Sequence, residues 1–76
     1  DLTLLRRSAE LGFAFAQALI AARTHGDEKF KFAQLAAGQG DRDGLFWLGR
    51  CFCGSEGCET DLDKAKENFL RASELG

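Results

Sequence analysis

The strongest constraint on the fold is an internal repeat. The ending RASELG at residues 71–76 is nearly duplicated by RRSAELG at residues 6–12. Gly12, Gly40 and Gly76 are equivalent points that divide the chain into intervals of 28 and 36 residues. Self-similarity at a period near 36 is the mark of a stacked-repeat protein. Such units build binding surfaces more often than active sites, so we expect a binding protein.

The repeat divides the chain into three parts of a single segment. Residues 1–12 are half a unit, residues 13–40 a shortened unit and residues 41–76 a complete unit. The difference in length lies at residues 53–60, between the two halves of the last unit. A surface loop is where extra residues cost least. We therefore expect one repeat segment that is part of a longer solenoid.

The composition predicts an all-α fold. The chain is 45% hydrophobic and has no proline, which favours uninterrupted helices. Three- and four-residue steps between apolar positions give core stripes typical of helices. Five helices are expected, at residues 2–11, 13–24, 27–39, 41–53 and 62–75.

Local signals agree with this assignment. Asp61 is a suitable N-cap and Gly76 a stop for the last helix. Gly44 and Gly49 lie inside one predicted helix, where each costs about 1 kcal/mol relative to alanine. Close helix crossing is the interpretation we prefer for both glycines over any catalytic use.

The complete unit carries a spaced pattern of about ten positions. It comprises Gly44, Leu48-Gly49, Phe52, Gly57-Cys58, Asp61, Lys64-Ala65, Arg71-Ala72-Ser73-Glu74 and Gly76. This pattern resembles the Sel-one-like repeat family, which is related to the tetratricopeptide repeats. The departures are Ser55 for a loop glycine, Cys58 for valine and Asn68 for tryptophan.

The resemblance implies a right-handed α-solenoid of antiparallel helix pairs that serves as an adaptor or scaffold. The leading helix of each pair would line a concave face, and the partner would be a protein or peptide. On a helical wheel for residues 41–53, Phe46 and Arg50 face away from the core and Trp47 lies on the flank. Phe15 is the flank residue of the preceding leading helix. These four residues are our candidate partner-binding site, because aromatic residues and arginine dominate binding hot spots. The alternative is that Trp47 and Phe15 pack between repeats.

Other functional classes have weaker support. The net charge is −2, and the one basic pair is Arg6-Arg7, so no nucleic-acid partner is expected. No apolar run reaches the length of a membrane span, so no membrane insertion is expected in this segment. His25 has no serine, cysteine or acid at a recognisable motif spacing, and a turn or capping role is expected for it. No enzyme activity and no cofactor are predicted, and the sequence does not indicate a localisation.

The cysteines leave three interpretations open. Cys51, Cys53 and Cys58 can be small apolar packing residues, Cys53 and Cys58 can form a disulfide across the loop, or the cluster can bind a metal. Packing is preferred and no metal site is predicted. The alternative function is therefore a cysteine-based redox or metal-sensing helical module. Finally, Leu62 and either Phe69 or Leu70 should remain uncovered, which predicts marginal stability or self-association of the isolated chain.

Overall fold

A computed structural model describes residues 2–76, which form five α-helices. The helices are α1 (Leu2–Glu10), α2 (Ala14–Arg23), α3 (Gly26–Gly38), α4 (Arg42–Gly54) and α5 (Leu62–Glu74). Both ends of every helix fall within one residue of the range expected from the sequence, and the predicted all-α class is confirmed. In this part of the chain, no helix has the length and apolar character needed to cross a bilayer.

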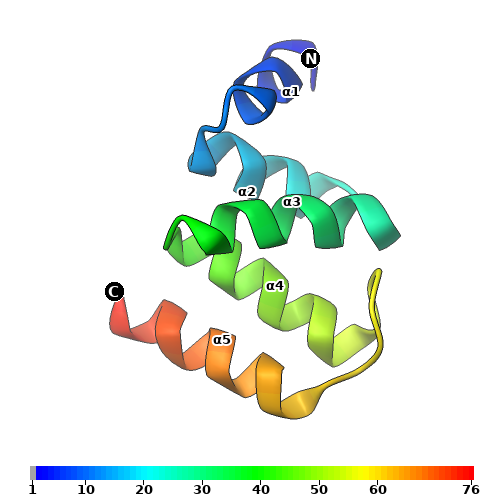
Figure 1. Ribbon diagram of the computed structural model, residues 1–76, viewed down its shortest axis with the longest axis vertical. Helices are drawn as coiled ribbons and strands as arrows, with labels where there is room; N and C mark the ends of the chain where they lie inside the picture. Colours follow the sequence, from blue (N-terminus) through cyan, green and yellow to red (C-terminus); the bar gives the residue numbers. More distant parts are fainter. Residues whose placement is uncertain (1) are drawn as a thin grey trace.

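The helices follow one another through the molecule in chain order (Figure 1). Each helix packs on the next one, and α2 also contacts α4. Figure 1 shows α1 and α5 at opposite ends, with the long connection between α4 and α5 passing along one side. Two successive leading helices, α2 and α4, therefore lie against each other and share a face.

Small residues bring the helices close together. A Cβ atom added to Gly44 on α4 would lie 2.5 Å from the Cβ atom of Ala36 on α3. A Cβ atom added to Gly49 would lie 2.9 Å from the ring of Phe69 on α5. The structure thus confirms the expected packing role of both glycines. The rest of the core is also rich in alanine, and its largest fully buried side chains are Ile20, Leu45 and Cys51.

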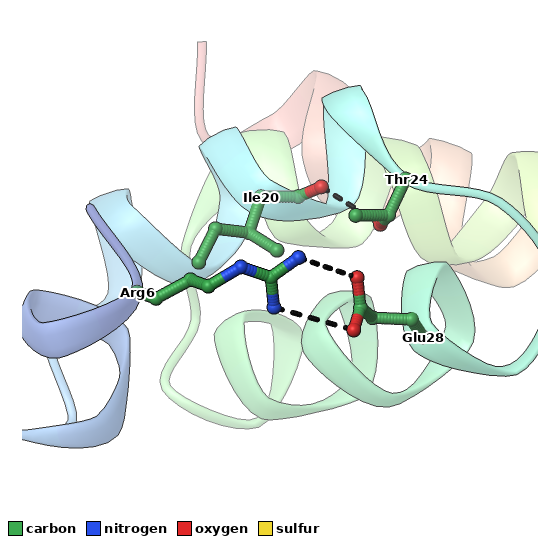
Figure 2. Close-up of polar contacts among 4 residues, drawn as sticks. All are labelled: Arg6, Ile20, Thr24 and Glu28. Atoms are coloured by element: carbon green, nitrogen blue, oxygen red, sulfur yellow. Dashed lines mark hydrogen bonds and ion pairs between the residues drawn. The ribbon is translucent and has the colours of Figure 1, made fainter. Parts of the chain in front are cut away.

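Polar contacts attach α1 to the following helices. Figure 2 shows Arg6 of α1 reaching the carboxylate of Glu28 on α3, with two hydrogen bonds of 3.2 and 2.9 Å. The Arg6 guanidinium lowers the pKa of Glu28 below its usual value. The buried side chain of Gln17 donates to the carbonyl of Ala9 (3.1 Å) and accepts from Gln39 (2.8 Å). The half unit therefore packs on the shortened unit through specific contacts as well as apolar ones.

The helix ends show how the chain turns. Asp61 accepts a hydrogen bond from the backbone N–H of Lys64 (3.1 Å), which confirms the predicted N-cap of α5. At the end of α2, the Thr24 hydroxyl donates to the carbonyl of Ile20, as Figure 2 shows. After α4, Ser55 adopts φ 56°, a left-handed conformation that favours glycine. Because Ser55 carries a side chain in this conformation, the turn is locally strained.

Candidate functional site

Three of the four predicted partner-binding residues form one cluster on α4. The rings of Phe46 and Trp47 meet edge to face, with centroids 5.2 Å apart. The Arg50 guanidinium carbon lies 5.8 Å from the Phe46 centroid and 5.7 Å from the Trp47 centroid. Phe15 is exposed near the beginning of α2, where its ring pairs with Phe13. The structure thus joins Phe46, Trp47 and Arg50, whereas Phe15 lies in a separate aromatic pair.

Phe46 is less independent of the fold than the helical wheel indicates. Its side chain is partly open, but its ring also lies 5.8 Å from that of Phe69 on α5. The physical reason is that Gly49, one turn further along α4, lets the large Phe69 side chain come close. Replacing Phe46 by alanine therefore affects packing between α4 and α5 as well as any bound partner.

A buried lysine that the sequence did not identify as a site residue lies beneath this cluster. Lys29 of α3 is 7% exposed, and its ammonium lies 4.3 Å from the centroid of the Trp47 ring. The same ammonium donates a hydrogen bond to the carbonyl of Ala21. A cation over an aromatic face is attracted by the ring quadrupole. The available sequence signal was that Lys29 occupies the position held by the core residue Ala65 in the next unit.

The loop after α4 closes one side of the cluster through Glu56. The Glu56 carboxylate accepts a hydrogen bond from the backbone N–H of Gly26, at the beginning of α3. It also lies 3.7 Å from Nδ1 of His25. The Gly26 amide is the main cause that lowers the pKa of Glu56. His25 occupies the N-cap position of α3, as the expected turn or capping role requires, but its side chain makes no capping bond. The Glu56 carboxylate of the next unit accepts from the Gly26 N–H instead.

These groups surround a cleft of about 370 Å³ between the end of α2, the beginning of α3 and α4. Its lining residues are Ala22, His25, Lys29, Trp47, Arg50, Gly54 and Glu56. The volume is within the range of sites that hold a small ligand or a few side chains. The cleft presents two cations, one carboxylate and an indole ring. These groups suit recognition of a segment that has both polar and apolar side chains.

The three cysteines carry free thiols in the structure. Cys51 is buried, and burial raises its pKa to about 11. Cys58 is half-buried, its pKa is also raised by burial, and its Sγ lies 3.5 Å from the carbonyl oxygen of Cys51. Cys53 is exposed, and no Cys53–Cys58 disulfide is formed in the structure. Thiolate chemistry is favoured where the pKa is lowered, and at Cys51 and Cys58 it is raised.

Within residues 2–76, no group of three histidine, cysteine, aspartate or glutamate side chains is arranged to hold a metal ion. Comparisons with family models, with curated proteins and with solved structures gave no match.

Proposed function

We propose that the chain is a non-catalytic interaction module that binds a protein or peptide segment over the face shared by α2 and α4. The observation that supports this most is the cluster of Phe46, Trp47 and Arg50 beside the cleft over Lys29. Aromatic residues bury a large area at low entropic cost, and arginine adds directional hydrogen bonds. The cluster thus has the side-chain types that dominate binding interfaces.

The architecture that we propose is a right-handed α-solenoid of the Sel-one-like kind. The resemblance supports this, and so does the contact between α2 and α4, because stacked repeats place successive leading helices side by side. In that arrangement the shared face would be the concave surface of an adaptor or scaffold. A partner would lie across several leading helices, as expected for an extended peptide or a helix.

The test is selection of peptides from a phage-displayed library on the intact chain. Trp47 is the single tryptophan, so its fluorescence reports ligands that reach the cluster. Each selected peptide is then titrated against the native chain, Arg50→Ala, Phe15→Ala and the control Lys66→Ala, whose side chain is exposed on α5. We expect about tenfold weaker binding to Arg50→Ala and an unchanged affinity for the control. If selection enriches no peptide, or if Arg50→Ala binds as tightly as the native chain, the proposed function is wrong.

A further inference from the structure

A second surface feature is a groove between α4 and α5, at the opposite end of this helix pair from the loop that joins them. It has a volume of about 460 Å³ and is mostly apolar. Its lining includes Arg42, Asp43, Phe46, Phe69, Ala72 and Ser73. The Phe46 and Phe69 rings, 5.8 Å apart, form an aromatic floor, and Arg42 and Asp43 give one rim a charge of each sign.

The first unit shows what covers the equivalent groove between α2 and α3. There α4 contacts both helices, and the backbone at Gly44 presses against Ala36 and Ala37. Ala18 on α2 is 3% exposed, whereas Phe46 at the same position of α4 is 39% exposed.

The trailing helices show the same difference between the two units. Ala37 on α3 is buried, whereas Ser73 at the same position of α5 is exposed. The positions that α4 covers in the first unit are therefore open in the second. Leu62 and Leu70, elsewhere on α5, are also exposed, as expected from the sequence.

We propose that the α4/α5 groove is a docking site for an amphipathic helix of the α4 kind. The helix must carry glycine where it crosses Ala72, because Gly44 occupies that place against Ala36. A larger side chain would meet the α5 backbone, as a Cβ atom at Gly44 would meet backbone atoms of Ala36 and Ala37 at 2.7 Å. The helix must also be apolar toward Phe46 and Phe69. Phe46 belongs both to this groove and to the proposed peptide-binding cluster, whereas Phe15 and Arg50 do not line the groove. Arg50→Ala and Ser73→Arg therefore test the two sites separately.

The test uses a fluorescein-labelled peptide with the sequence of residues 41–54, in which serine replaces both cysteines. Anisotropy titrations compare this peptide with a matched peptide that carries Gly44→Leu. They also compare the native chain with Ser73→Arg, which fills the groove from an exposed position, and with Gln34→Arg, the same charge change on an exposed part of α3. Overpacking of about 1–3 kcal/mol corresponds to a loss of affinity of about five- to 150-fold. We expect that loss for the leucine peptide and for Ser73→Arg, and no change for Gln34→Arg.

A second measurement addresses the weak helicity of short peptides in water. The segment 41–54 is joined directly after Gly76, so that the helix is supplied at the millimolar effective concentration of a short linker. The extended chain should unfold at a higher urea concentration than the native chain, and its Gly44→Leu form should not. Equal midpoints for the two extensions would overturn the proposal. So would dimerisation of the native chain that Ser73→Arg abolishes without any peptide binding, because the occupant would then be a second copy. If the phage-displayed library yields no peptide for the α2/α4 face, the binding of the 41–54 helix to the α4/α5 groove is unaffected.

Discussion

Replacing Gly44 by alanine tests whether α3 and α4 pack as closely as the structure shows. Two opposing effects decide the outcome. Alanine is favoured over glycine within a helix by about 1 kcal/mol, which would stabilise the chain. The new Cβ atom, however, would lie 2.5 Å from the Ala36 Cβ atom and 2.7 Å from two backbone atoms of α3. Because backbone atoms cannot rotate away, the helices must separate.

The size of the effect follows from the distances. Ordinary van der Waals contact begins at 3.4 Å, so α4 must move by about 1 Å. Overpacking of a closely packed interface costs about 1–3 kcal/mol, and the movement also loosens the contacts of Leu45. We expect Gly44→Ala to lower the free energy of unfolding by about 1–2 kcal/mol after the propensity gain. A domain of this size has little stability to spare, so the effect should be readily measured.

The matched control is Gly38→Ala. Gly38 is the last residue of α3, and a Cβ atom there would have no atom within 4 Å. Alanine at this position should stabilise the chain by a few tenths of a kcal/mol up to about 1 kcal/mol. Both variants are unfolded in urea while Trp47 fluorescence and circular dichroism at 222 nm are followed. If Gly44→Ala raises the midpoint as Gly38→Ala does, the close crossing of α3 and α4 is refuted.

Three other changes have outcomes set by single contacts. In the same urea assay, Ser55→Gly should raise the free energy of unfolding by about 0.5–1 kcal/mol. The reason is that left-handed backbone costs a non-glycine residue about 1–2 kcal/mol. An unchanged unfolding midpoint would mean that the turn is unstrained. Iodoacetamide at pH 8 should label the exposed Cys53 rapidly and Cys51 only after unfolding, because Cys51 is buried and its pKa is raised to about 11. Labelling is followed by peptide mapping, and modification of both thiols at the same rate would contradict this prediction. The pKa of Glu56 is lowered in the folded chain, so its contribution to stability is present above its usual pKa of 4.5 and is lost as the pH falls through the lowered value. Glu56→Gln should therefore lessen the acid-induced fall in the unfolding midpoint, and an unaltered pH profile would show that the contact contributes nothing.

The helices and their crossing points could be predicted because they depend on nearby residues. Apolar spacing and capping residues such as Asp61 placed all five helices within one residue of their observed ends. The repeat itself identified Gly44 and Gly49 as positions where a side chain would not fit. These features depend on local sequence or on comparison of one unit with the other, and both are available without coordinates.

The features that were missed depend on how the units lie against each other. Glu56 caps α3 from 30 residues away, and this contact exists only because the loop of the second unit lies over the beginning of α3. Lys29 on α3 is stabilised by an α2 carbonyl and by the Trp47 ring on α4. Its buried position therefore depends on the packing of three helices and could not be predicted from α3 alone. The helical wheel of α4 alone likewise could not show that Phe69 would reach the Phe46 ring.

The two units also differ in a way that connects packing with the proposed groove. The positions of Ala21 and Ala33 in the first unit are held by Gly49 and Phe69 in the second, and the Phe69 ring lies directly against Gly49. A smaller residue on the leading helix thus compensates for a larger one on the trailing helix. The exchange also brings the Phe69 ring beside Phe46, where the first unit has Ala33 and Ala18. The second groove therefore has more aromatic surface than the first, and a helix with smaller side chains than α4 opposite these two rings would fit it more closely. Selecting the appended segment 41–54 for tighter docking should accordingly enrich alanine or glycine on that side of the helix.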